Sequence, residues 1–281
     1  MELGAHMSIS GGVENCVSNG HEVGCEVVQL FTKSNRRWAA SELEDDDRSA
    51  FLEEQEKTGV RAVMVHMAYL VNLASPKDEQ FEKSFNGFIQ EIERAEFLNV
   101  PYICFHPGSH TGQGEEDALE QVAEAVTNAL AESDTEEVRV LIEGMAGQGT
   151  SIGYQFEHLA FLLEEIEPAE RIGICLDTAH LHAAGYSLDP EDGYEETMTE
   201  FDEVVGTQNL FAWHLNDTDE ELGSRVDRHQ HIGEGQIGKE AFRCLVSDSR
   251  FEGVPGVIET PKEDDWDQKN ISLLKELREG S

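Results

Sequence analysis

The segment IGICLDTAH, residues 172–180, runs from a short apolar stretch into Asp177 and His180, two side chains of the types that bind metal ions. The stretch has the length and the Ile and Leu content of one buried strand. Similar apolar runs recur along the whole chain, at residues 3–5, 27–32, 62–67, 102–106, 138–143, 210–215 and 254–260. We therefore predict eight buried β-strands.

Helical patterns lie between these runs. Apolar residues recur three or four positions apart within 81–95 and again within 119–129, and Gly59 is a plausible helix stop after residues 51–58. Strand and helix thus alternate eight times, and no G-x-G-x-x-G turn of a doubly wound sheet is present. This pattern predicts an α/β fold, a (β/α)8 TIM barrel, that forms a single domain over residues 1–281.

The composition is strongly acidic, with 20 Lys and Arg against 58 Asp and Glu and a net charge of −38. Such a charge makes a compact chain repel itself in dilute salt, and it is typical either of disorder or of a surface adapted to molar salt. The regular apolar runs favour the second interpretation, so we expect a halophilic source.

The sequence also indicates the cellular compartment and the chemical state of the cysteines. It has no apolar run of about 18 residues, and its N-terminus lacks the pattern of a signal peptide. We therefore expect a cytoplasmic monomer that does not bind membranes. The five cysteines show no C-x-x-C spacing, which indicates reduced, mostly buried thiols and neither a disulfide framework nor a cysteine zinc site.

Six of the eight predicted strands end in a residue that can bind a metal, and in a TIM barrel these ends meet at the catalytic rim. These residues are His66, His106, Glu143, Asp177, His214 and Glu259. Three more donors, His180, Asp227 and His229, lie in the loops that follow strands six and seven. Each alone is more often a hydrogen-bonded loop residue. Together they exceed the needs of one ion, and this set without thiolates suits three zinc or manganese ions, with one carboxylate bridging.

At these positions the chain resembles endonuclease IV, the zinc-dependent apurinic/apyrimidinic endonuclease family. The resemblance covers nearly the whole chain, from residues 4–6 to residues 259–260. It rests on several segments in a fixed order, namely HMAYLVNLA (66–74), FHPGSH (105–110), AGQG (146–149), GICLDTAH (173–180), HLND (214–217) and GSRVDRH (223–229).

The resemblance implies a specific distribution of ligands. One Zn²⁺ would bind His66, His106 and Glu143, a second Glu143, Asp177, His214 and Glu259, and a third His180, Asp227 and His229. Glu143 and Glu259 would be the catalytic carboxylates. The expected reaction is attack by a metal-held hydroxide on the phosphate 5′ to an abasic site, which leaves a 3′-hydroxyl and a 5′-deoxyribose phosphate.

The expected partner is double-stranded DNA that contains abasic sites. By the same resemblance, Arg36, Tyr69 and Leu70 would enter the base stack. Lys33, Arg225 and Arg228 would contact phosphates, which would give the acidic body a basic rim. Alternatively, Arg36 and Arg37 pair with the nearby Glu42 and Glu44, and Tyr69 and Leu70 pack beneath their loop with Val71 and Leu73. The family pattern is broken at Ala179, at Gly144-Met145 and at Thr218-Asp219, and none of these changes removes a ligand.

Two other functions are compatible with parts of this pattern. Glu143, Asp177, His214 and Glu259 alone would make a one-metal site for a sugar isomerase or epimerase of similar architecture. A non-catalytic protein that sequesters metal or binds DNA is the other alternative. The additional donors favour the nuclease, because a one-metal isomerase has no need of them.

Overall fold

The computed structural model describes residues 1–39, 41–190 and 193–280. Eight parallel strands close into one barrel in chain order, as predicted, and β8 pairs with β1 through Val257 and Gly4. The strands are β1 (Glu2–Met7), β2 (Val27–Leu30), β3 (Arg61–His66), β4 (Tyr102–Phe105), β5 (Arg139–Glu143), β6 (Ile172–Asp177), β7 (Leu210–His214) and β8 (Pro255–Ile258).

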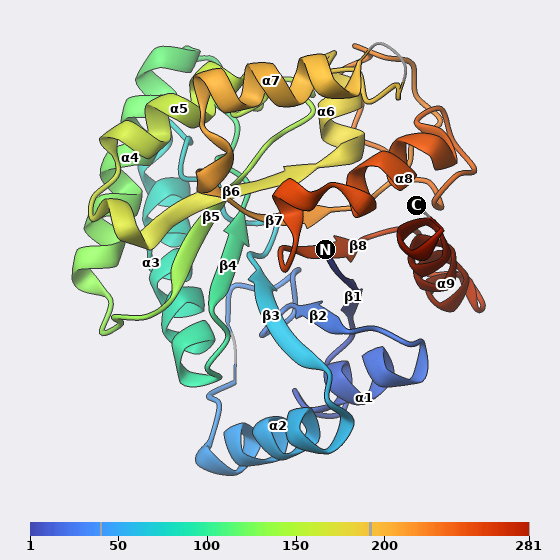
Figure 1. Ribbon diagram of the computed structural model, residues 1–281. Coiled ribbons are helices and arrows are strands. Elements are labelled where there is room, and N and C mark those ends of the chain that lie inside the picture. The colour runs from blue at the N-terminus through green and yellow to red at the C-terminus, as the bar shows by residue number, and fades with distance from the viewer. Residues whose placement is uncertain (40, 191–192, 281) are drawn as a thin grey trace.

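Helices surround the outside of this barrel (Figure 1). They are α1 (Asn15–Glu22), α2 (Asp45–Thr58), α3 (Asp78–Phe97), α4 (Glu115–Glu132), α5 (Phe156–Glu165), α6 (Thr178–Ala184), α7 (Tyr194–Val204), α8 (Gly238–Ser247) and α9 (Trp266–Glu279). Gly59 ends α2 with a left-handed backbone (φ 75°), so the predicted helix stop is confirmed. Among the described residues, no helix has the length and apolarity needed to cross a lipid bilayer.

The core has two layers, because successive side chains of a strand point to opposite faces of the sheet. In β6, Ile174 and Leu176 belong to the large cluster between sheet and helices, whereas Cys175 belongs to the cluster that fills the barrel. The inner cluster contains Val27, Val63, Met64, Cys104, Leu141, Cys175, Ala212 and Val257. Val63 and its neighbour Met64 both belong to it because the register between β2 and β3 shifts at Val63, which breaks the alternation there. This inner layer forms the floor beneath the carboxyl ends of the strands.

Candidate metal centre and nucleic-acid interface

The six donors at the strand ends follow directly from the alternation along the strands. Met64, Cys104, Leu141, Cys175, Ala212 and Val257 fill the barrel, and each stands two positions before one of the six donors. A residue two positions further along a strand points to the same side, so all six donors point inward at the carboxyl rim. Several strands end one or two residues before the predicted bound, and for two donors this matters: β4 ends at Phe105 and β8 at Ile258, so His106 and Glu259 are the first residues after their strands.

The carboxylate of Glu143 lies at the centre of this group and is completely buried. Its Oε2 is 3.2 Å from His66 Nε2 and 3.1 Å from His106 Nε2. Its Oε1 is 3.0 Å from His214 Nδ1 and 3.3 Å from His180 Nδ1. Burial acts to raise the pKa of Glu143, but His106 and His214 outweigh it and hold the pKa well below its usual range. Glu143 is therefore ionised and can face more than one cation.

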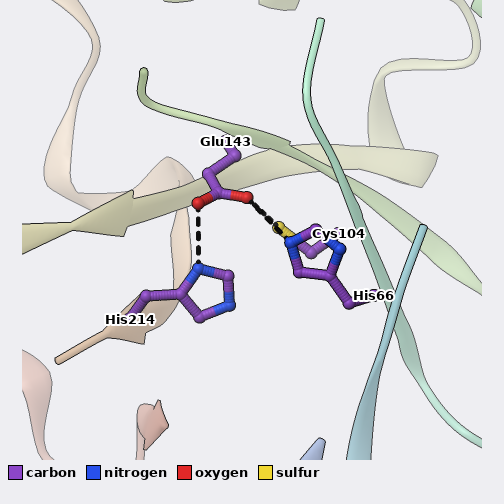
Figure 2. Close-up of side chains that lie close together, drawn as sticks. All are labelled: His66, Cys104, Glu143 and His214. Carbon is purple, nitrogen blue, oxygen red and sulfur yellow. Dashed lines mark hydrogen bonds and ion pairs between the residues drawn. The ribbon is translucent and has the colours of Figure 1, made fainter. Parts of the chain in front are cut away.

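Figure 2 shows Glu143 between His66 and His214, with the Cys104 thiol beside His66. The ligand atoms of these four residues all lie within 4.8 Å of one another. The Cys104 sulfur is 3.5 Å from Glu143 Oε2, and burial raises the pKa of this thiol. Four of the five cysteines are buried and none forms a disulfide, as the sequence predicted, but the position of Cys104 beneath Glu143 was not foreseen.

Three histidines are oriented by backbone carbonyls. His66 Nδ1 donates to the carbonyl of Met67 (2.8 Å), His180 Nδ1 to that of Gly144 (2.9 Å), and His229 Nδ1 to that of Glu259 (3.2 Å). Each ring therefore leaves Nε2 as the atom available to a metal. The Nε2 atoms of His180 and His229 are buried and have no hydrogen-bond partner among the described residues. A bound cation would satisfy both nitrogens.

These two nitrogens face Asp227, whose Oδ1 is 3.2 Å from His180 Nε2 and 3.4 Å from His229 Nε2. Although burial acts in the opposite direction, His180 and His229 hold the pKa of Asp227 below its usual value. The ligand atoms of Asp177, His180 and His229 form one group within 4.8 Å, and those of Glu143, Asp177, His214 and Glu259 form another. The structure thus brings all nine predicted donors to one rim.

Two buried polar side chains that the sequence analysis missed hold these donors in place. Gln29 Oε1 accepts from His214 Nε2 (2.9 Å), and its Nε2 donates to Glu259 Oε1 (2.6 Å). Asn216 donates to Asp177 Oδ2 (2.7 Å) and accepts from the backbone N–H of Glu259 (2.8 Å). Asn216 lies within the HLND segment, and Gln29 is a polar residue in an apolar run. Both signals were present in the sequence, but their partners are distant along the chain.

Most of the candidate DNA contacts lie on the surface of the protein. Tyr69 is 58% exposed, so it does not pack beneath its loop, and Arg36, Arg225 and Arg228 are exposed as well. Leu70 is partly buried. Within the described residues, Arg36 forms no ion pair with Glu42 or Glu44 and is therefore available to a phosphate.

Two of the predicted phosphate contacts are engaged within the protein. Lys33 is buried, with Nζ 3.2 Å from Glu91 Oε1 and 2.9 Å from Gln90 Oε1, which favours a role in fixing its own loop. The Arg225 guanidinium stacks on the ring of Tyr154, 4.5 Å from its centre. Contact of Lys33 and Arg225 with DNA stays a prediction.

An open cavity of about 410 Å³ joins the two sets of residues. It is lined by Tyr69, His106, His180, Asp227, Arg228, His229 and Glu259. Five candidate ligands, one exposed aromatic ring and one cation therefore border the same space. This arrangement suits an anionic group that reaches the ligands while its neighbours rest against the rim.

Sequence comparison relates the chain to proteins that are named as probable endonucleases. A family model described as a xylose isomerase-like TIM barrel matches residues 17–277. A protein of Chloroflexus aurantiacus named "Probable endonuclease 4" is 49% identical over an alignment of 281 positions, and the alignment covers 99% of each chain. A protein of Geotalea daltonii with the same name is 42% identical over 277 residues, which are 98% of this chain and 97% of the relative.

Comparison with solved structures gives a consistent result. The crystal structure of endonuclease IV from Thermus thermophilus matches with a TM-score of 0.89 and 32% identity, and the match covers 100% of both chains. A D-tagatose 3-epimerase-like protein has a TM-score of 0.72 at 16% identity over 99% of this chain and 97% of that one. The second likeness shows the barrel fold alone.

Proposed function

Because this chain belongs to the endonuclease IV family and is therefore a nuclease, we propose that it cuts duplex DNA on the 5′ side of abasic sites. The products would be a 3′-hydroxyl and a 5′-deoxyribose phosphate. The observation that carries this proposal is the third group of donors, in which the buried Nε2 atoms of His180 and His229 make no hydrogen bond but lie 3.2 and 3.4 Å from Asp227 Oδ1. A one-metal sugar epimerase would not need this group.

The residues present fit three zinc ions. His66, His106 and Glu143 would hold the first, Glu143, Asp177, His214 and Glu259 the second, and His180, Asp227 and His229 the third. The mixture of imidazole and carboxylate suits Zn²⁺, and Mn²⁺ could replace it at some positions. When bound, such ions lower the pKa of water and neutralise the charge that develops on the phosphate and on the leaving oxygen.

The protein's own contribution is to fix the donors before substrate arrives. Glu143 would serve two of the proposed sites, because its Oε2 faces His66 and His106 and its Oε1 faces His214. Gln29 fixes both His214 and Glu259, so these two ligands cannot rotate independently. Asn216 connects Asp177 to the backbone of Glu259 in the same way. Rigid donors keep the reacting phosphate at a constant position relative to the ions.

Recognition of the lesion would come from the rim. An abasic site lacks one stacked base, so opening the duplex there costs less than in intact DNA. The exposed ring of Tyr69, with Leu70 and Arg36, would occupy the space that the missing base leaves. Arg225 and Arg228 would contact phosphates and Lys33 would support its loop. Attraction by these few cations must compete with the charge of −38, so apolar insertion and direct contact of phosphate with the metal ions would contribute much of the affinity.

The test is incision of a duplex that contains one abasic site, with an intact duplex of the same sequence as control. The proposal expects one cut on the 5′ side of the lesion, a 3′ end that a polymerase can extend, loss of the cut with a chelator and recovery with Zn²⁺. A product cut on the 3′ side of the lesion, or incision unaffected by thorough chelation, would overturn it.

A further inference from the structure

The carboxylate of Asp217 is the most heavily hydrogen-bonded side chain near the metal centre to which the proposed reaction assigns no role. Asp217 follows β7 by three residues and is completely buried. Its Oδ1 accepts the backbone N–H groups of Thr218 (2.8 Å) and Ile237 (3.0 Å). Its Oδ2 accepts those of Gly233 (2.9 Å), Gly235 (3.1 Å) and Gly238 (3.3 Å). Within the described part of the chain, no Lys, Arg or His forms an ion pair with it.

The five amides belong to residue 218 and to residues 233–238, the two ends of the segment that joins β7 to α8. We define residues 218–237 as the β7–α8 loop. It carries Asp227 and His229 of the third donor group, together with Arg225 and Arg228. The Asp217 carboxylate therefore closes this loop upon itself, because it binds the residue at its start and the residues at its end.

The two halves of the loop are fastened differently. The first half is tied to α6 and to the loop after β5, through the N–H of Gly223 to the His182 carbonyl (3.0 Å) and the N–H of Asp227 to Gln148 Oε1 (2.8 Å). The second half is tied to Asp217. Besides the carboxylate bonds, the backbones of Asp217 and Gln230 exchange two hydrogen bonds, of 3.2 and 2.7 Å. Gln230 directly follows His229.

We propose that Asp217 is a positioning residue that folds the β7–α8 loop and thereby presents His229, beside Asp227, to the third metal. The hydrogen bonds that shape the loop join protein groups to one another, so we expect the same arrangement in metal-free protein. The expected effect on the third metal rests on the proposed function, which assumes that this metal binds. The claim that Asp217 shapes the loop can be tested separately, because the loop can be studied in metal-free protein.

Asparagine is the sharpest substitution, since it preserves size and removes the charge. Both oxygens of Asp217 accept N–H groups, whereas Asn has only one oxygen. In either orientation its NH2 group would face at least two backbone donors and leave them without an acceptor. Asp219→Asn is the matched control, because Asp219 is on the same loop but exposed, and its carboxylate accepts a hydrogen bond from the Gln230 side chain at 2.9 Å.

Gly235→Ala disturbs the same contact from the other side without a change in charge. A Cβ at Gly235 would lie 2.3 Å from the Thr218 carbonyl oxygen and 2.6 Å from Asp217 Oδ1. Because real Cβ atoms do not approach backbone this closely, the end of the loop must move away from Asp217. Both variants should therefore have the same effect on the loop. Because only Asp217→Asn removes a charge, a shared effect would show that the hydrogen bonds of the Asp217 carboxylate matter and not its charge.

The experiment measures bound zinc by elemental analysis after dialysis against a weak chelator, and amide hydrogen exchange with and without zinc. We expect the parent and Asp219→Asn to keep three ions. Asp217→Asn and Gly235→Ala should keep two, with affinity at the third site about 10- to 100-fold lower. Amides of residues 229–238 should exchange faster in both variants, even in metal-free protein, while the barrel strands exchange as in the parent.

Three ions and unchanged loop protection in either variant that folds would overturn the inference. If Asp217→Asn does not fold, Gly235→Ala decides by the same two measurements. If the parent itself binds fewer than three ions, the third metal of the proposed function fails, and loop exchange in metal-free protein alone decides the role of Asp217.

Discussion

Replacement of Tyr69 by alanine tests how the protein would distinguish an abasic site from intact DNA. The ring is 58% exposed and stands at the rim of the metal centre, with its centre 5.5 Å from the rings of both His66 and His106 and 5.7 Å from that of Phe31. Its exposed part is available to a base or to the gap that a base leaves. Its buried part packs against the histidines.

The two parts predict two separate losses. Stacking of an aromatic side chain on a base contributes about 1–3 kcal/mol, so discrimination between abasic and intact duplex should fall roughly 5- to 150-fold. A tyrosine side chain can bury roughly 200 Å². Because about two-fifths of the Tyr69 side chain is buried, its removal at about 25 cal/mol per Å² lowers the free energy of unfolding by at most ~2 kcal/mol. The variant should therefore melt only a few degrees lower.

The assay is competition binding and single-turnover incision, in tenths-molar and in molar salt, at a temperature where the variant is fully folded and holds the same number of metal ions as the parent. Tyr69→Phe is the control, since it keeps the ring and loses only the hydroxyl. We expect it to discriminate as the parent does. If Tyr69→Ala binds and incises abasic DNA with the parent's selectivity, the ring does not enter the lesion, although the metal assignment could stand.

Three further predictions concern the metal centre and the surface. Glu143→Gln should lower single-turnover incision by about 10³-fold or more while the fold survives in circular dichroism, because the carboxylate serves two ions; the exposed Glu240→Gln should change neither. The melting temperature should rise from tenths-molar to molar salt, as screening reduces self-repulsion, and a flat response would refute the halophilic interpretation. In metal-free protein, burial lowers the pKa of His229 but Asp177 and Asp227 raise it overall to about 9. Because the folded protein binds this proton more tightly than the unfolded chain, protonation of His229 stabilises the fold. The stabilisation is complete below about pH 6.5, the pKa of histidine in the unfolded chain, and is lost as the pH rises through 9. Urea unfolding at pH 6 and at pH 9.5 measures the free energy of unfolding, and His229→Gln should reduce the difference between the two values.

The barrel was predictable because its strands and helices have local periodicities that short apolar runs reveal. The rim donors were predictable for the same reason, since the alternation that buries Leu141 and Cys175 also places Glu143 and Asp177 inside the rim. The bounds of β4 and β8 differed by one residue or two, because hydrogen bonding between strands, rather than hydrophobicity, decides where a strand ends.

The supporting contacts were not predictable, because their partners are far away along the chain. Gln29 meets His214 across 185 residues and Glu259 across 230. No local pattern distinguishes Lys33, whose partner Glu91 makes it a buried ion pair, from a cation that reaches solvent. The halophilic source and the assignment of ions to ligands stay predictions from the sequence.

The number of metal ions that the active protein requires decides whether the nine donors form three metal sites. Metal-free protein is titrated with Zn²⁺, and bound zinc and incision of the abasic duplex are measured at each step. Bound zinc should approach three ions per chain, and incision should follow occupancy of the last of them. Full activity with one bound ion would contradict the assignment of three metal sites, because nine donors gathered at one rim would then have no common purpose.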